Sequence, residues 1–249
     1  VEVSPGHFSH YSLKDSIINR ISAIELRKQP GYHYSDLGFI LLTEMMRQSE
    51  GVSLDHLTDS LFFRPNGLHT LGYSPLARFP SRRIVPSEVD TVYRRAELHG
   101  FVNDPTAALM GGVSGHAGLF GNAEDVAKMM QQFLGGGPEE KQGIFRHETL
   151  RVFTSYAFPG TENRRGLGFD KPEKKFRQNG PACQSASAGS FGHSGFTGTY
   201  AWADPENQLV FVFLSNRTWP SATNRKLIEM NLRTRIHQRV YDILNQSKP

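Results

Sequence analysis

The stretch SFGHSGFTGTYAWADPENQLVFVFLS, residues 190–215, determines the fold class. Residues 190–203 and 208–215 predict two β-strands, and residues 204–207 (DPEN) between them are typical of a hairpin turn. Residues 209–214 are apolar at every position, which predicts a strand buried on both faces with helices covering each side. We therefore expect an antiparallel sheet in the last third of the chain.

Helical patterns come before this sheet region. Isoleucines recur at helical spacing between about residues 14 and 27, which predicts a helix there. Ser35 or Asp36 can cap a second helix, and Gly51 would end it. The buried stripe of this second helix is expected to comprise Leu37, Ile40, Leu41 and Met45.

Two further helices flank the sheet region in the sequence. Asn122 with Asp125 is typical of a helix start. The closing helix has an i, i+4 apolar stripe, which is expected to be its buried face: Ile228, Leu232, Ile236 and Val240. Its arginines are expected to form a solvated face: Arg225, Arg233, Arg235 and Arg239. Residues 166–169 are predicted as a short strand.

The order of these elements predicts an α+β fold. We expect one domain over residues 1–249, with a helical region at about 14–155 and the sheet strands and final helix at about 165–246. Residues 70–120 are repeatedly interrupted by proline and glycine, so we expect a long ordered excursion beside a site.

Composition excludes several classes of protein. Hydrophobic residues make up 38% and charged residues 21% of the 249, as in a soluble globular protein. The net charge of +4 is mild and the basic residues form no long stripe, so we expect no nucleic-acid partner. No apolar run approaches the ~18 residues that a membrane helix needs. A single cysteine, Cys183, excludes an internal disulfide framework.

Three segments are candidates for a site. Tyr34-Ser35-Asp36 is either a simple helix cap beside a packed tyrosine or a phenol that moves a proton. In Gly192–Gly198, small residues let a ligand approach the backbone, and His193 could carry charge near a substrate. The alternative for that segment is an edge strand with a satisfied histidine. Gly111–Phe120 is a binding loop or, as we favour, a tight backbone crossing.

Together and in this order, these segments resemble the serine β-lactamase-like and penicillin-binding family, in its class C and esterase branch. Tyr34-Ser35-Asp36 resembles the family's Tyr-x-Asn element. Residues 193–195 resemble its Lys-Thr-Gly strand in the form that carries histidine. Residues 65–70 resemble its Pro-Leu-Gly-Met turn, and residues 111–125 its glycine loop running into a helix. The resemblance implies an incomplete β-lactamase-like fold.

The resemblance also implies acyl transfer through a serine acyl-enzyme. Tyr34 would be the general acid and base of that reaction. His193 would take the electrostatic role of the strand lysine. Asp36 stands where the family usually has an amide, and a carboxylate there could pair with His193 and favour the charged imidazole.

The remaining implied roles concern substrate binding. Ser194 and Gly195 would line the pocket, and the backbone N–H of Phe196 would supply one oxyanion donor. The substrate would be a small molecule or a cell-wall-derived compound. No cofactor is implied, and His7 and His10 lack a third ligand for a metal ion.

One departure from the family pattern stands out. No lysine of the chain has a serine three residues before it, so the Ser-x-x-Lys nucleophile element is absent. Only 33 residues precede Tyr34, and the chain starts with Val1. We therefore expect the C-terminal part of a larger domain that pairs with a missing N-terminal segment. Residues 208–215 would then form an open sheet edge, through which the chain could dimerise.

Two functional hypotheses follow. The first is part of a serine hydrolase that acts on an ester, amide or β-lactam. The second is a non-catalytic relative that binds peptidoglycan fragments or serves as an accessory domain on a glycosidase. Residues 163–172 and 191–217 most resemble a Bacteroidetes-type domain that follows a family 3 glycoside hydrolase, a β-N-acetylglucosaminidase. The resemblance implies a periplasmic or secreted protein.

A third reading, an unrelated α+β binding module, would leave Tyr34 and His193 far apart.

Overall fold

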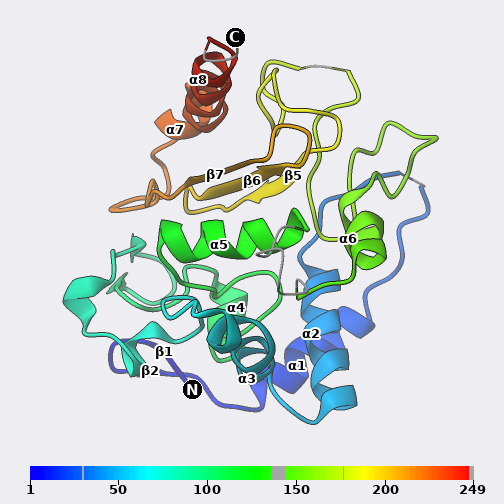
Figure 1. The fold of residues 1–249 in the computed structure, drawn as a ribbon. Helices are drawn as coiled ribbons and strands as arrows, with labels where there is room; N and C mark the ends of the chain where they lie inside the picture. The colour runs from blue at the N-terminus through cyan, green and yellow to red at the C-terminus, as the bar shows by residue number, and fades with distance from the viewer. Residues whose placement is uncertain (30, 136–143, 176, 247–249) are drawn as a thin grey trace. The chain divides into compact units, whose positions relative to one another are not determined.

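The computed structural model describes residues 1–29, 31–135, 144–175 and 177–246 (Figure 1). The chain divides into two compact units. The first comprises Val1–Gly121 with Thr218–Ala222, and the second comprises Asn122–Arg217 with Thr223–Pro249. The prediction of one domain over residues 1–249 stays a prediction.

The first unit combines helices with two small antiparallel sheets. Its helices and strands are β1 (Glu2–Ser4), β2 (His7–Phe8), α1 (Leu13–Ser22), α2 (Leu37–Glu50), α3 (Leu54–Thr58), β3 (Glu88–Asp90), β4 (Ala96–Leu98) and α4 (Pro105–Leu109). Strand β1 pairs with β2, and β3 pairs with β4. Short π or 3-10 turns occupy Asp59–Phe63, Arg64–Asn66, Pro75–Ala77 and Ser81–Arg83. The expected excursion at 70–120 therefore contains a hairpin and short helical pieces.

Helix α2 ends as predicted but buries a different face. Gly51 adopts the left-handed conformation (φ 71°) that terminates a helix. The buried residues of α2 are Ile40, Thr43 and Glu44, whereas Met45 is 64% exposed. Of the expected stripe, Ile40 is buried as predicted, but Leu37 and Met45 are exposed, so the stripe is wrong at those two positions. The physical reason is an ion pair, since Lys14 of α1 lies 3.2 Å from the Glu44 carboxylate and holds it inward.

A buried ion pair fixes the β3–β4 hairpin. The Asp90 carboxylate accepts hydrogen bonds from the backbone N–H groups of Val92, Tyr93 and Arg94. The Arg94 guanidinium donates to Asp90 at 2.9 Å and also to the carbonyl oxygens of Val102 and Asn103. These bonds lower the pKa of Asp90 to about 2, although burial opposes the shift. The charges of Asp90 and Arg94 are both paired, so this ion pair holds the hairpin and residues 102–103 of the excursion together.

The second unit is built on a three-stranded antiparallel sheet. Its elements are α5 (Ala123–Phe133), α6 (His147–Thr154), β5 (Phe191–Ser194), β6 (Tyr200–Asp204), β7 (Leu209–Phe213), α7 (Lys226–Glu229) and α8 (Leu232–Gln246). The strand order is β5-β6-β7, with Ser194 opposite Tyr200 and Trp202 opposite Phe211. Helix α5 starts as predicted, because Asn122 Oδ1 accepts from Asp125 N at 2.8 Å.

Residues 190–203 form two strands, not the single strand that was predicted. Gly195 N donates to Thr199 O at 2.9 Å, and Gly198 N donates to Gly195 O at 3.1 Å, which closes a tight reversal. Gly198 has φ 109°, and a Cβ there would collide with the Ser215 side chain. Glycine thus allows the chain to turn between β5 and β6. The predicted strand at 166–169 is also absent, and only an isolated bridge joins Asp170 to Gly192.

Helices cover both faces of this sheet, as the apolar run at 209–214 predicted (Figure 1). On one face, Met130 of α5 packs with Phe191 and Ala203. On the other face, Tyr200 and Trp202 pack with partly buried phenylalanines of β7. Helix α8 covers that second face through ring contacts with Tyr200 and Phe211. Strand β7 is an edge strand among the described residues.

Helix α8 buries Thr234, His237 and Tyr241 rather than the predicted apolar stripe. Ile236, a member of that stripe, is 40% exposed. The buried face is chosen by partners on the sheet, because the His237 ring stacks on Phe211 with centroids 4.5 Å apart. The arginines are not all solvated either. The half-buried Arg233 donates to the carbonyl oxygens of Gly195 and Thr199, at 3.4 and 3.2 Å.

Asp204 connects three parts of the second unit. Its carboxylate accepts from the backbone N–H groups of Glu206 and Asn207, which makes the predicted hairpin turn. It also accepts from the N–H and hydroxyl of Ser187 and from the Tyr241 hydroxyl of α8. Burial alone would raise the pKa of Asp204, but these hydrogen bonds lower it. One carboxylate therefore ties the turn, the 185–190 segment and α8 together.

Replacing Asp204 is expected to destabilise the protein. Asp204→Ala leaves several buried donors unsatisfied, and we expect a loss of about 3 kcal/mol or more in the free energy of unfolding. Urea denaturation measures this, and Asp204→Asn is a milder second variant if Asp204→Ala fails to fold. Asp242→Ala, which removes a partly exposed carboxylate of α8, is the control and should cost under about 1 kcal/mol. Equal losses for Asp204→Ala and Asp242→Ala would contradict the connecting role.

Burial of His237 is expected to make stability depend on pH. Burial lowers the pKa of His237 to about 4, whereas an unfolded histidine titrates near 6.5. Between these values the unfolded state binds more protons, so stability falls as the pH drops from about 6.5 to 4, by on the order of 3 kcal/mol.

Unfolding of the His237→Gln variant should show a flatter pH dependence across this window, whatever its stability at neutral pH. The same substitution at the exposed His147 of α6 serves as the control and should leave the slope unchanged. A wild-type slope in His237→Gln would contradict the prediction.

Candidate functional site

Tyr34 and Asp36 lie at the start of α2 in the first unit. Asp36 occupies the N-cap position, but its side chain makes no capping hydrogen bond. The Ser35 hydroxyl instead accepts from Leu37 N at 3.2 Å. Tyr34 is 55% exposed, so its ring is not packed in a core. This exposure argues against the packed-tyrosine alternative.

His193, Ser194, Gly195 and Phe196 lie in the second unit. The first two residues end β5, and Gly195 begins the reversal toward β6. A Cβ at Gly195 would collide with the Thr199 hydroxyl, so a larger residue here would force the Thr199 side chain to move. Phe196 is 66% exposed, and the Arg217 guanidinium lies over its ring at 4.7 Å.

The candidates are thus divided between the two units. Tyr34 and Asp36 belong to the first, and residues 193–196 belong to the second. The structure brings the members of each group together within their own unit. The hypothesis that both groups form one site stays a prediction, and so does the pairing of Asp36 with His193.

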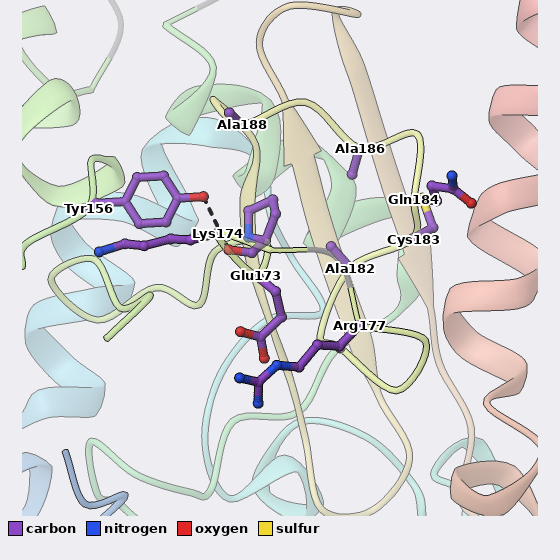
Figure 2. A pocket seen from close by; sticks show the side chains of 11 residues that line it. Tyr156, Glu173, Lys174, Arg177, Ala182, Cys183, Gln184, Ala186 and Ala188 are labelled. Carbon is purple, nitrogen blue, oxygen red and sulfur yellow. Dashed lines mark hydrogen bonds between the residues drawn. The ribbon is translucent and has the colours of Figure 1, made fainter. Parts of the chain in front are cut away.

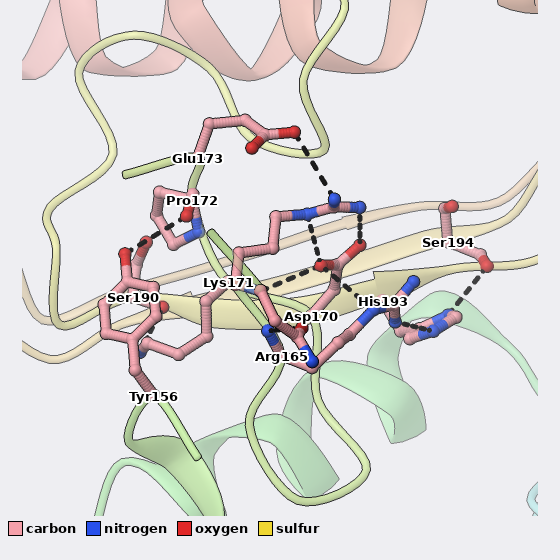
Figure 3. A network of polar contacts seen from close by, with 11 residues as sticks. Tyr156, Arg165, Asp170, Lys171, Pro172, Glu173, Ser190, His193 and Ser194 are labelled. Atoms are coloured by element: carbon pink, nitrogen blue, oxygen red, sulfur yellow. Dashed lines mark hydrogen bonds and ion pairs between the residues drawn. The ribbon is translucent and has the colours of Figure 1, made fainter. Parts of the chain in front are cut away.

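The His193 ring lies between a hydrogen-bond donor and a hydrogen-bond acceptor (Figure 3). Its Nε2 lies 2.9 Å from Nη1 of Arg165, and its Nδ1 lies 2.9 Å from the Ser194 carbonyl oxygen. A guanidinium only donates, so Nε2 must accept and carry no proton. A carbonyl oxygen only accepts, so Nδ1 carries the proton. This geometry matches the Nδ1–H tautomer of His193, and the guanidinium beside β5 belongs to Arg165.

Acidic side chains hold the two arginines of this network (Figure 3). The Asp170 carboxylate lies 2.8 Å from Nε of Arg164 and 3.6 Å from Nε of Arg165. Glu173 lies 3.4 Å from the Arg164 guanidinium. The backbone of Asp170 exchanges two hydrogen bonds with Gly192 of β5, at 2.8 and 3.0 Å. The segment is thereby fastened beside the strand, and Arg165 is oriented toward His193.

Lys171 attaches the same segment to neighbouring backbone. Its buried ammonium donates to the carbonyl oxygens of Thr154, Ser190 and Gly189, at 2.6, 2.9 and 3.2 Å. It also lies 4.9 Å from the centre of the Tyr156 ring. Burial lowers the pKa of Lys171 to about 8, and the charge of Asp204 opposes this shift. The ammonium therefore joins residue 171 to residues 189–190 and closes the loop between them.

Sequence reasoning missed Arg165, Asp170 and Lys171 as parts of this site. The signal that could have found them is the dense run of charges at 164–174, within one of the stretches that resembles the family. Their roles depend on contacts with β5, which is more than 20 residues away in the sequence. Periodicity within the segment contains no trace of those contacts.

The glycine loop at 111–118 packs on α2 in the first unit. Gly115 N donates to the Thr43 hydroxyl at 2.8 Å, and a Cβ at Gly115 would lie 2.8 Å from the Phe39 carbonyl oxygen. This supports the tight backbone crossing. The Ser114 hydroxyl, His116 and Asp104 form a hydrogen-bonded chain with both distances 2.9 Å. Ser114 is only 2% exposed, so this chain fixes the loop and offers no accessible nucleophile.

The described helices include none that is both long and apolar enough to cross a membrane.

Comparison with known proteins identifies relatives along most of the chain. A model of the beta-lactamase family matches residues 4–231. An Escherichia coli K12 protein named "Putative D-alanyl-D-alanine carboxypeptidase" is 34% identical over 224 residues, covering 82% of this chain and 50% of that protein. Its namesake from Salmonella enteritidis PT4 is 31% identical over 234 residues, covering 86% and 52%. The chain spans about half the length of the curated relatives it matches.

Solved structures with the same fold are more distant in sequence. A penicillin-binding protein homologue from Caulobacter crescentus has a TM-score of 0.58 at 16% identity, covering 87% of this chain and 60% of that one. D-amino acid amidase from Ochrobactrum anthropi has a TM-score of 0.56 at 16% identity, covering 84% and 63%. These likenesses confirm the predicted α+β fold. The matches lend no support to a glycoside hydrolase neighbour.

The tautomer of His193 is a direct test of the network. Long-range ¹H–¹⁵N correlation spectra of histidine-labelled protein should show His193 with Nδ1 protonated and Nε2 unprotonated at neutral pH. In Arg165→Gln the donor to Nε2 loses its charge, and the Nε2–H tautomer should become populated. Arg151→Gln, an exposed arginine of α6, is the control. A protonated Nε2 in the wild-type protein would refute the assigned geometry.

Proposed function

Because the chain belongs to the beta-lactamase family, we propose that it is the C-terminal part of a serine hydrolase that cleaves peptides ending in D-alanine. The observation that carries the proposal is the fixed cation beside β5. Arg165 is held by Asp170 and oriented toward His193. A substrate with a free terminal carboxylate complements such a cation. The relatives named as D-alanyl-D-alanine carboxypeptidases support this substrate class.

In the proposed reaction, a serine attacks the carbonyl carbon of the terminal peptide bond and forms an acyl-enzyme, and the terminal amino acid leaves. Water then cleaves the ester, which releases the shortened peptide as its acid and frees the serine. The exposed phenol of Tyr34 moves the proton between the nucleophile and the leaving amine. Asp36 orients groups at the start of α2. The substrate is bound by His193, Ser194 and Gly195.

The oxyanion of the tetrahedral intermediate needs preorganised donors. We assign one of them to the backbone N–H of Phe196, at the point where β5 turns toward β6. The reversal at Gly195–Thr199 and the Arg233 side chain hold this turn in place. Arg165 supplies the positive charge for the carboxylate of the substrate, with His193 held between the cation and the strand.

The nucleophile is proposed to lie outside these 249 residues, in an N-terminal segment of the same domain. The Ser-x-x-Lys element is absent from the sequence, and the relatives are about twice as long as the matched region. The β7 edge is the proposed attachment for that segment or for a second copy of the chain. The proposal includes a periplasmic or secreted location, where such substrates occur.

A non-catalytic domain that binds peptidoglycan fragments is the second candidate. The absence of Ser-x-x-Lys favours it. Two outcomes distinguish the candidates. Only the hydrolase releases D-alanine, and only the hydrolase forms a covalent adduct with penicillin in the full-length protein.

Catalysis by Tyr34 is tested in the full-length protein with a peptide that ends in D-alanyl-D-alanine. Tyr34→Phe removes the acidic proton and should lower kcat by about 100-fold or more. Tyr32→Phe, the same substitution two residues away on an exposed tyrosine, is the matched control and should retain activity. Arg165→Gln should mainly raise KM for substrates with a free carboxylate.

Labelling separates the candidates. The 249-residue chain is expected to form no adduct with a fluorophosphonate or a penicillin, whereas the full-length protein should form one. An adduct on a serine of the chain itself would contradict the missing nucleophile. No adduct and no D-alanine release from the full-length protein would favour the binding domain.

A further inference from the structure

A pocket of about 190 Å³ lies inside the loop that follows Lys171 (Figure 2). All its walls belong to the second unit. They are formed by Tyr156, Pro172, Glu173, Lys174, Arg177, Gly180, Ala182, Cys183, Gln184, Ala186 and Ala188. The volume is several times the ~30 Å³ that one water molecule occupies, so a small organic molecule fits.

The described parts of the loop are fastened at several points. The Lys171 ammonium bridges its two ends through the carbonyl oxygens of Gly189 and Ser190. Ser187 is bonded to Asp204, and Ser185 is bonded to Gln238 of α8. The pocket therefore exists before any ligand binds, which reduces the entropic cost of binding.

The charged groups of the pocket differ in their availability. The Lys174 ammonium donates to the carbonyl oxygens of Phe158, Pro159 and Thr161, which uses its three N–H groups. Among the described residues, the Glu173 carboxylate makes an ion pair with Arg164 at 3.4 Å through Oε1, and its other oxygen has no ion pair there. Arg177 is exposed, and its guanidinium provides five donors. Glu173 and Arg177 thus place one carboxylate and one guanidinium in the pocket wall.

Gly180 brings these two residues close to each other. A Cβ at Gly180 would lie 3.1 Å from Cγ of Glu173 and 3.0 Å from the carbonyl oxygen of Arg177. Gly180 N also donates to that carbonyl oxygen at 2.9 Å, which closes a turn. The backbone of Gly180 therefore leaves room for the Glu173 stem beside the residue that carries the guanidinium.

The rest of the pocket wall is apolar and small. Ala182 and Cys183 are 7% and 6% exposed, and Ala182 and Ala186 pack in one cluster with Tyr200 and Trp202 of β6. Burial raises the pKa of the Cys183 thiol to about 11, so this wall is uncharged at neutral pH. Methyl groups and a neutral thiol suit a short apolar side chain.

We propose that this pocket binds a small zwitterionic α-amino acid. Its ammonium group pairs with Glu173, its carboxylate pairs with Arg177, and its side chain contacts the alanine and cysteine wall. Charge-assisted bonds to two opposite groups distinguish an amino acid from a simple acid or amine of the same size. The inference stands apart from the proposed hydrolase, because binding needs neither a nucleophile nor Tyr34.

The test is a titration of the 249-residue chain with D-alanine and with L-alanine, followed by ligand-observed NMR. At least one enantiomer should bind saturably, with a Kd of about 1 mM. N-acetylalanine lacks the ammonium group and alaninamide lacks the carboxylate, so each should bind at least about tenfold more weakly. Absence of saturation about a hundredfold above that Kd, or equal binding of the blocked analogues, would overturn the proposal.

Variants assign the two charges. Arg177→Gln should weaken alanine about tenfold and leave alaninamide unchanged, while Glu173→Gln should weaken alanine and leave N-acetylalanine unchanged. Arg177 is exposed, so its variant keeps the test valid even if Glu173→Gln disturbs Arg164. Lys175→Gln, an exposed residue outside the pocket wall, is the control. Unaltered alanine binding in both pocket variants would also refute the site.

Failure here is distinguishable from failure of the proposed function. A full-length protein that releases D-alanine from peptides, while its pocket binds no amino acid, would overturn only this inference. Amino acid binding without any hydrolysis would leave this inference standing and overturn the hydrolase.

Discussion

The carboxylate of Asp204 is the constraint on which the second unit depends. It is 1% exposed, and a buried carboxylate is tolerated only when donors surround it. The donors come from the β6–β7 turn, from Ser187 and from Tyr241 of α8. The hydrogen bonds to this one carboxylate therefore stabilise the turn and the end of the loop that encloses the pocket. They also hold α8 against the sheet. The hydrophobic contacts of Trp202 and His237 add stability to an arrangement that this polar centre specifies.

The segment from Arg164 to Lys174 adds the chemistry to that scaffold. It contains alternating charges that are matched almost one to one: two arginines against Asp170 and Glu173, and two lysines against backbone carbonyl oxygens. The bridge between Asp170 and Gly192 fastens the segment to β5. The sheet is rigid, and the loop attached to it adds side chains in positions that no strand residue occupies. The same segment thus serves His193 on one side and the pocket on the other.

Local signals predicted the parts of the fold that local chemistry determines. The DPEN turn, the Asn122 cap and the left-handed Gly51 depend on neighbours within four residues, and all three are present. The inward faces of α2 and α8 depend on Lys14 and Phe211, which are distant in sequence. The predicted face of α8 was wrong, and that of α2 was right at Ile40 but wrong at Met45. The reversal at Gly195–Gly198 was hidden by strand-forming residues on either side. Motifs named Tyr34 and His193 as candidates, but Arg165 was missed because only the folded chain places it beside His193.

The charged group beside β5 in the proposed site is a guanidinium, and the His193 ring lies in contact with it. A guanidinium presents its donors in a planar fork, which suits the two oxygens of a carboxylate. Arg165 is held from two directions, because the Asp170 carboxylate lies 3.6 Å from its Nε and His193 lies 2.9 Å from its Nη1. The proposed carboxylate site therefore depends on the loop that carries Arg165 and Asp170 as much as on β5. In the proposed reaction, proton transfer is assigned to Tyr34 and the nucleophile.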